Sequence, residues 1–464
     1  MRCAVLALGV VVFTLVGCER QKAAPVGAVV PPDAAWELVS DDLDAVIGIV
    51  DIVSQARLLP FESGRLSRSG LEAAGLAAPI ALAGRDRGGV VVTGVLVDET
   101  RLQAALAAAT PTGWRRRRLV GRVDAVVDDA ERTRALVRGG DGVLVAVVDP
   151  VDDLAEAALV EALATGALPA PSRTSTGTTW RARLGQPLTT VFSDPLEGHV
   201  EVKGRQLTIS ARAPLRHEPV AIAVAAALGS LSSSAACVAD DRAMLTVHLP
   251  AVPGLGEAVA DVEDVDDALA GLPGQLDAFD GRLTIALVPH AEGTPVSVDE
   301  PASIVSVAVI GRPRAGGADG LRASLDEAMT GRRPETRTVG GRTIRSLGSA
   351  AAPWRRLSAI VDDDVFALGI GADVVVDRVA AGGVVCPPTA GLVTLQGPPL
   401  SRFVRRVPAE MRLAPRLQAW TGLENPLEVI DAVDELTLEA TPTSDGAALA
   451  LRLSLSVRSS APTP

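Results

Sequence analysis

Apolar side chains alternate with polar ones in several short stretches of the chain. The clearest stretch is the list Leu449, Leu451, Leu453, Leu455 and Val457, in which every second residue is apolar. A period of two predicts a strand with one buried face. Elsewhere a β-rich run is followed by apolar residues at helical spacing, at Leu102, Ala105, Leu106 and Ala109. The chain therefore mixes strands and helices.

The order of these elements occurs twice. Four segments of the first half resemble segments of the second half in pattern: Gly89–Ala109 and Ser303–Met329, Arg117–Val127 and Thr336–Leu347, Arg134–Asp149 and Leu357–Asp373, His199–Ala211 and Glu435–Val457. The first pair predicts a strand and a helix, the second predicts two strands joined by a turn, and the third predicts a hairpin followed by a helix. The fourth pair predicts a strand with one buried face, because its second copy alternates strictly. In the first copy that helix begins at Asp149 and Pro150, residue types that favour a helix start.

These patterns predict an α+β fold made by tandem duplication. Each copy is expected to be a mostly antiparallel sheet domain with helices packed on one face. The expected division has six segments: a leader at 1–17, a flexible tether at 18–33, a first repeat at 34–215, a linker at 216–235, a second repeat at 236–458, and a disordered tail at 459–464.

The leader has the plan of a secretory signal peptide. A single cation, Arg2, precedes an apolar core from about Ala4 to Val16, which is shorter than the roughly 20 apolar residues of a membrane-spanning helix. The residues Leu15, Val16, Gly17 and Cys18 close it.

This closing sequence resembles the lipobox of bacterial lipoproteins. The resemblance implies that the leader is cut before Cys18 and that Cys18 carries lipid, since two or more acyl chains make a stable membrane anchor. Glu19 is not the Asp that retains well-studied lipoproteins in the inner membrane, so we expect the outer membrane, facing the periplasm. An ordinary signal peptide with an incidental Cys18 is the alternative. The tether that follows can extend about 50 Å.

Charge and composition exclude some partners. The 464 residues carry 44 Lys and Arg against 56 Asp and Glu, a net charge of −12. Nucleic acids and anionic membrane surfaces attract basic faces, so neither is an expected partner. With Cys3 in the leader and Cys18 in the lipidation site, Cys237 and Cys386 remain for a possible disulfide in an oxidising compartment. Two separate buried thiols are the other interpretation.

Two charged runs are candidate sites. Asp362, Asp363 and Asp364 could supply oxygen ligands to a hard cation, but a tight hairpin turn is the interpretation we prefer. The run Arg115–Arg118 could bind an anion. A charged edge strand, neutralised by the nearby Asp124, Asp128 and Asp129, is favoured instead.

The remaining reactive residues form no catalytic motif. The four histidines, His199, His217, His248 and His290, lack the spacing of a zinc site, and no nucleophile elbow or phosphate loop occurs. We predict no metal, no cofactor and no catalytic residue, so the enzyme class is left open with a preference for no enzyme.

The sequence therefore favours a lipid-anchored envelope protein with a non-catalytic role. It would bind or scaffold an unknown partner protein or apolar ligand. The alternatives are a periplasmic carrier of lipids or lipoproteins, or an envelope hydrolase whose site is assembled only by the fold.

Overall fold

The computed structural model describes a little more than half of the chain. The described residues are 34–56, 75–84, 90–96, 98, 100–102, 104, 114–120, 123–128, 131, 133–138, 143–147, 160, 161, 163–165, 177–183, 192, 193, 195–216, 243–251, 278–290, 305–349, 352–382, 392–407, 426–443 and 447–458. The predicted leader, tether and tail, together with Cys18, Cys237 and Cys386, lie outside these residues.

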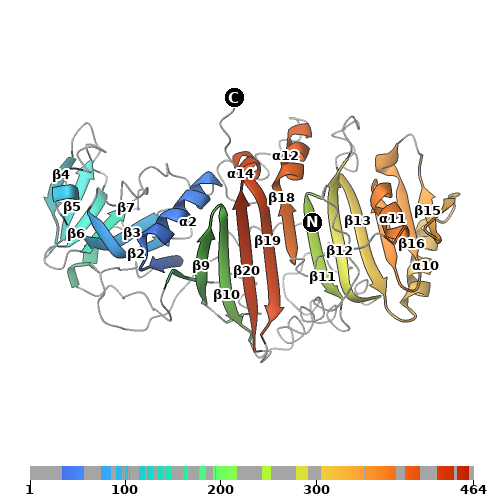
Figure 1. The fold of residues 1–464 in the computed structure, drawn as a ribbon, viewed down its shortest axis with the longest axis horizontal. Coiled ribbons are helices and arrows are strands. Elements are labelled where there is room, and N and C mark those ends of the chain that lie inside the picture. The colour runs from blue at the N-terminus through green and yellow to red at the C-terminus, as the bar shows by residue number, and fades with distance from the viewer. Residues whose placement is uncertain are drawn as a thin grey trace. The chain divides into compact units, whose positions relative to one another are not determined.

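The chain divides into two compact units. Unit 1 comprises Met1–Ala213 with Trp420–Glu424, and unit 2 comprises Pro214–Ala419 with Asn425–Pro464. Both are mostly antiparallel sheet with some helices, which confirms the α+β class (Figure 1). Among the described helices, none is long and apolar enough to cross a membrane.

Unit 1 has ten described strands and a long helix. The elements are β1 (Trp36–Ser40), α2 (Leu43–Gln55), β2 (Leu76–Gly84), β3 (Val90–Leu96), β4 (Trp114–Arg118), β5 (Val123–Asp128), β6 (Thr133–Arg138), β7 (Val143–Val147), β8 (Thr179–Ala182), β9 (Leu196–Lys203) and β10 (Gln206–Pro214). Residues 100–102 and 104 after β3, and 160, 161 and 163–165 after β7, are also helical.

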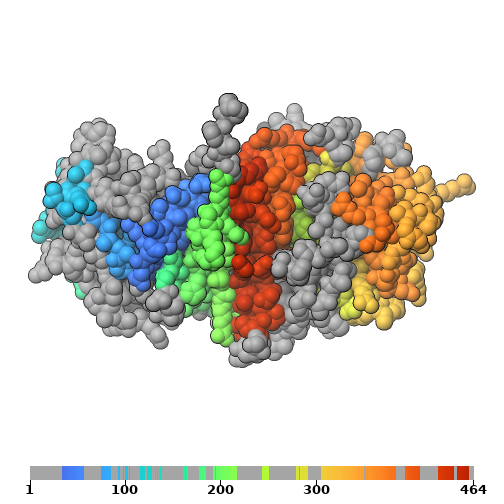
Figure 2. Space-filling view, viewed as in Figure 1, coloured from blue at the N-terminus to red at the C-terminus, as the bar shows by residue number. Residues whose placement is uncertain are grey.

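Helix α2 covers part of this sheet. The side chain of Asp42 accepts a hydrogen bond from the Asp44 amide and so caps the helix start. The helix buries Val46 and Val50 and packs against β1, β2 and β9, and its outer side lies on the surface in the space-filling view (Figure 2).

Unit 2 also has ten described strands. Its elements are β11 (Leu245–Ala251), β12 (Phe279–Pro289), β13 (Val305–Pro313), α10 (Gly317–Ala328), β14 (Glu335–Val339), β15 (Arg342–Leu347), the 3-10 helix η3 (Pro353–Arg355), β16 (Leu357–Val361), β17 (Phe366–Ile370), α11 (Asp373–Ala380), β18 (Val393–Gln396), α12 (Gly397–Arg406), α14 (Pro426–Ala432), β19 (Val433–Pro442) and β20 (Ala448–Val457).

The two units have the same strand order. In unit 1 neighbouring strands pair in the order β4-β5-β6-β7-β3-β2-β1-β8-β9-β10, always antiparallel. In unit 2 the order is β14-β15-β16-β17-β13-β12-β11-β18-β19-β20, again antiparallel. Each strand of unit 1 therefore has a counterpart in unit 2 with the same neighbours.

The hairpins predicted from the sequence are confirmed. They are β4–β5, β14–β15, β6–β7 and β16–β17. The fourth pair of segments also forms hairpins, β9–β10 and β19–β20, and β20 is the predicted alternating strand. In β14–β15, Val339 pairs with Arg342 across Gly340 and Gly341, whose φ angles are 57° and 83°. A two-residue turn with two positive φ angles requires glycine or a similarly permissive residue, so this turn fixes the position of Arg342. The start of the helix predicted at Asp149 lies outside the described residues.

The prediction that helices pack on one face is wrong for unit 2. Ile344 and Ile360 pack in one cluster with Val375 and Val379 of α11. Leu347 and Ala359 of the same two strands pack in another cluster, whose helical members are Leu325 and Met329 of α10. Since successive residues of a strand point to opposite faces, α10 and α11 cover opposite faces.

The physical reason lies in the sequence of β16. Its residues LSAIV are buried at three consecutive positions, so both faces of the strand are apolar or occupied by a small hydroxyl. Such a strand needs cover on both sides.

The two-sided core predicts a large cost for shortening Ile360. Ile360 is 0% exposed under α11, so Ile360→Ala should lower the free energy of unfolding by about 2–5 kcal/mol in denaturant titrations. The control Val374→Ala changes a side chain of α11 that is 57% exposed and should shift stability by less than about 0.5 kcal/mol. Equal effects of the two variants would contradict this packing.

Candidate functional site

The acidic run Asp362–Asp364 forms the turn between β16 and β17. Val361 pairs with Phe366, and the Asp362 amide donates a hydrogen bond of 2.9 Å to the Val365 carbonyl, which closes the hairpin. The preferred interpretation, a tight hairpin turn, is therefore confirmed.

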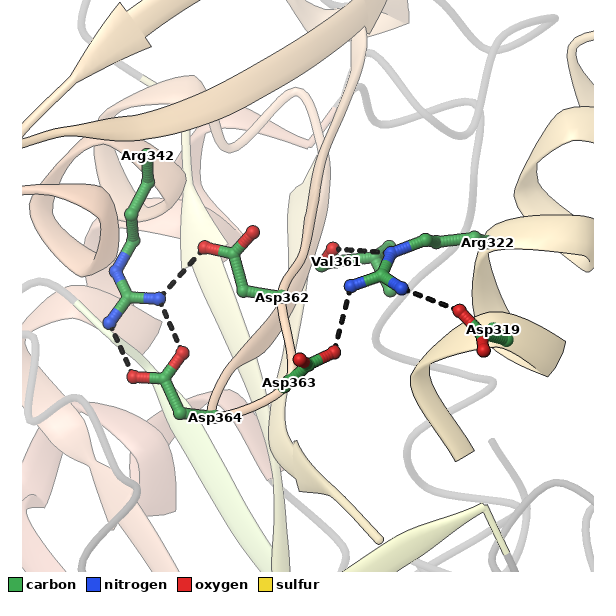
Figure 3. A network of polar contacts seen from close by, with 7 residues as sticks. All are labelled: Asp319, Arg322, Arg342, Val361, Asp362, Asp363 and Asp364. Carbon is green, nitrogen blue, oxygen red and sulfur yellow. Dashed lines mark hydrogen bonds and ion pairs between the residues drawn. The ribbon is translucent and has the colours of Figure 1, made fainter. Parts of the chain in front are cut away.

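Two arginines hold the turn from opposite sides (Figure 3). Arg342 donates from Nη1 and Nη2 to both carboxylate oxygens of Asp364, each at 2.7 Å, and from Nη1 to Asp362 at 2.8 Å. Arg322 of α10 donates to Asp363 at 2.9 Å, to Asp319 at 2.6 Å, and from Nε to the Val361 carbonyl at 3.2 Å. The fork of a guanidinium suits such paired acceptors.

These contacts set the electrostatics of the turn. The hydrogen bonds from Arg342 lower the pKa of Asp364, with partial burial opposing the shift, and the same pair raises the pKa of Arg342. The side chain of Asp364 is nevertheless 64% exposed and that of Asp363 is 91% exposed, so solvent screens both ion pairs. The cluster stabilises the turn modestly. Among the described residues no group of His, Cys, Asp and Glu has the geometry of a metal site.

A second polar network anchors the start of α11. Asp373, the first residue of that helix, accepts a hydrogen bond of 2.5 Å from Ser358 and an ion pair of 3.3 Å from Arg356. Ser358 also contacts Ser346 at 2.8 Å, and both serines are buried. A carboxylate at a helix N-terminus is favoured by the helix dipole, so this network ties α11 to β15 and β16.

The run Arg115–Arg118 lies on β4, which pairs with β5 at one end of the described strand order of unit 1. The four side chains are exposed. Arg116 and Arg118 form ion pairs with Asp124, and Arg115 and Arg117 with Glu131. Neutralisation of the arginines by Asp124 is therefore confirmed. The position of β4 at the end of the described strand order agrees with the favoured interpretation, a charged edge strand.

The described histidines have structural partners. His248 is buried, and its Nδ1 lies 2.9 Å from the Thr284 hydroxyl on the adjacent strand. His290 Nδ1 lies 2.8 Å from the hydroxyl of Ser306, which in turn donates a 2.7 Å bond to the Gly371 carbonyl. His199 is exposed on β9, and His217 lies outside the described residues.

The His290–Ser306 pair is not arranged for nucleophilic attack. A serine nucleophile needs its proton directed at a base. Here the Ser306 proton is directed at the Gly371 carbonyl, so His290 Nδ1 must be the donor toward Ser306.

Another charged group of unit 1 was not recognised from the sequence. Four charged residues are register partners across four neighbouring strands. They are Glu37 on β1, Arg181 on β8, Glu197 on β9 and Arg212 on β10. These residues are far apart in the sequence, and no motif marks them. The corresponding strands of unit 2 carry a row of hydroxyls instead, at Thr246, Thr394, Thr437 and Ser454.

Comparisons with known proteins add little. No family model and no curated protein matches the chain. A solved structure described as crystal form III of TP0453 is similar at 10% identity and a TM-score of 0.29, covering 48% of this chain and 92% of that chain. A similarity of this strength identifies neither a fold nor a function.

The Arg342–Asp364 pair predicts a pH-dependent contribution to stability. Because the folded-state pKa of Asp364 is depressed, its stabilisation is present above its ordinary pKa and is lost as the pH falls through the folded value. Asp364→Asn should cost about 0.2–1 kcal/mol near neutral pH and nothing in strong acid, as measured by urea titrations across the pH range. A cost that is independent of pH would contradict the assignment.

The buried network predicts a larger effect at Ser358. Ser358→Ala removes partners of both Asp373 and Ser346 and should cost about 1–3 kcal/mol of unfolding free energy. Ser324→Ala changes an exposed serine of α10 and should be neutral or slightly stabilising in the same denaturation assay. A neutral Ser358→Ala would show that the network contributes nothing.

Proposed function

We propose that the chain is a lipid-anchored cell-envelope protein whose body binds or scaffolds a partner protein or an apolar ligand without catalysis. The anchor rests on the leader at 1–17 and on the sequence Leu15-Val16-Gly17-Cys18, which resembles a lipobox. We place the protein in the outer membrane facing the periplasm, because Glu19 follows the lipidated cysteine.

The observation that carries the non-catalytic role is the binding of Asp362, Asp363 and Asp364 by arginines. These residues are the most site-like cluster in the sequence. Every one of the three carboxylates accepts hydrogen bonds from Arg342 or Arg322. Arg342 lies on β15, the strand that pairs with β16, and Arg322 lies on α10, so both partners come from elements packed beside the hairpin, which supports a role in holding the turn.

The Ser306 and His290 geometry supports the same role. A hydrolase of the serine type would require the serine proton to point at the imidazole, and the hydroxyl of Ser306 donates to a backbone carbonyl instead.

We also propose that the body arose by duplication, with repeats at 34–215 and 236–458. The matching strand order of the two units supports this, because strand pairings distant in sequence, such as β3–β7 and β13–β17, recur between corresponding strands. The same holds for β1–β8 and β11–β18. Random similarity of two α+β sheets would not be expected to reproduce all nine pairings of a unit.

The role is tested by purifying the full-length protein from membranes and analysing co-purifying molecules by mass spectrometry. A stoichiometric protein that stays bound through a high-salt wash supports scaffolding. A reproducible apolar molecule other than the anchor supports ligand binding. A protein that carries neither would contradict the proposed role.

The anchor is tested by substituting the cysteines of the leader region. Cys18→Ser should abolish incorporation of an alkyne-labelled fatty acid and leave the leader uncut, because the residue at the lipidation position then has no thiol. The matched control, Cys3→Ser, changes a thiol within the leader and should label and process as the unaltered protein does, as read by gel fluorescence and intact mass. Normal labelling and processing of Cys18→Ser would contradict the anchor.

A further inference from the structure

Glu37 is a carboxylate placed beside an apolar cluster in the sheet of unit 1. On one side its strand partner is Ala83 of β2, and on the other it is Arg181 of β8. Val39, Ala81 and Ala83 form a buried cluster on the same face. The side chain thus lies between alanine methyl groups and one guanidinium.

That guanidinium forms its ion pair with another carboxylate. Arg181 Nε lies 3.3 Å from Glu197 Oε1, so the register partner of Glu37 already binds Glu197. Arg212 of β10 is the register partner of Glu197. Farther along β9 the same face carries His199, Glu201 and Lys203, which differ from Glu197 by even numbers of positions. From β2 the facing residues are alanines.

Helix α2 adds no charge to this face. A side chain added at Gly48 of α2 would touch Val202 of β9. Val202 and Glu197 differ by an odd number of positions on one strand, so they point to opposite faces, and α2 lies on the face away from Glu37.

The carboxyl group has access to water. A depression of about 10 Å³ is lined by Glu37, Val39, Thr179, Trp180, Arg181, Glu197 and Gly198. This is about the volume that one water molecule requires, which suffices for a proton to enter and leave.

We infer that Glu37, with Arg181 and Glu197, forms a proton-operated switch in unit 1. When protonated, Glu37 packs as a neutral side chain against Val39 and the alanines of β2 and holds β1 in the sheet. When ionised, it places a charge beside that apolar cluster and weakens the pairing of β1. Strand β1 begins at Trp36, directly after the proposed tether, so the switch acts on the strand nearest to the proposed anchor.

The electrostatics support this direction. Burial raises the pKa of Glu37, Arg181 opposes that shift, and Glu197 adds to it. With a folded-state pKa above the unfolded one, the folded state binds the proton more tightly. Stability is then highest below the ordinary glutamate pKa and falls as the pH rises to the folded value, above which it levels off.

The test compares the full chain, the variant Glu37→Gln and the control Glu201→Gln across pH 4 to 8. Glu201 lies on β9 and is 58% exposed beside Lys203. In the unaltered protein we expect amide hydrogens of β1 to exchange faster as the pH rises, after correction for intrinsic exchange rates. The increase should be roughly tenfold for each pH unit between the unfolded-state pKa and the folded-state pKa of Glu37. Glu37→Gln should remove that increase, and Glu201→Gln should retain it.

A second measurement is made on the unaltered protein and so does not depend on whether a variant folds. Titration of its carbon-13-labelled glutamate side chains should show a carboxyl that ionises above the ordinary range, and this signal should be missing from the spectrum of Glu37→Gln. The absence of such a carboxyl, or an exchange profile of Glu37→Gln that matches the unaltered protein at every pH, would overturn the switch.

Discussion

The backbone pairing between strands that are distant in sequence is the constraint on which the rest of the structure depends. In each unit three strands of a meander separate two strands that must meet: β3 pairs with β7, and β13 pairs with β17. Buried backbone groups need hydrogen-bond partners, so these pairings fix where the hairpins and helices can lie. The charged clusters follow from that arrangement. Arg342 and Asp364 meet because β15 and β17 both flank β16, and Glu37 meets Arg181 because β1 flanks β8.

The two units use one arrangement for different side-chain chemistry. Across four corresponding strands, unit 1 carries the charged row from Glu37 to Arg212 and unit 2 carries the row of hydroxyls from Thr246 to Ser454. A charge beside a buried apolar cluster responds to protons, whereas a hydroxyl does not titrate in the physiological range. If the repeats share an origin, as we propose, the charged row from Glu37 to Arg212 is a feature of the first repeat.

Local patterns in the sequence predicted local structure well. Alternating leucines identified β20, and glycine-containing turns identified the hairpins, because these features depend on residues close together in the chain. The Asp362–Asp364 turn was predicted for the same reason. The arginines that bind this turn were not, because Arg342 and Asp364 are separated by 22 residues and meet only through the sheet register. The placement of α10 and α11 on opposite faces was also missed, although the consecutive buried positions of β16 carried a signal for it.

The central claim is that both units pair their strands in one shared order. It is tested most directly by pairs of cysteines introduced at register partners, in a chain whose Cys237 and Cys386 are replaced by serine. The pairs are Thr93 with Val145 in unit 1 and Val309 with Leu368 in unit 2. Register partners in antiparallel strands lie within the range that a disulfide spans. The account predicts oxidation to a disulfide in both pairs and none between Val309 and Leu347 of β15, a strand that does not pair with β13 among the described pairings. A bond in only one of the two units, or a bond between Val309 and Leu347, would contradict it.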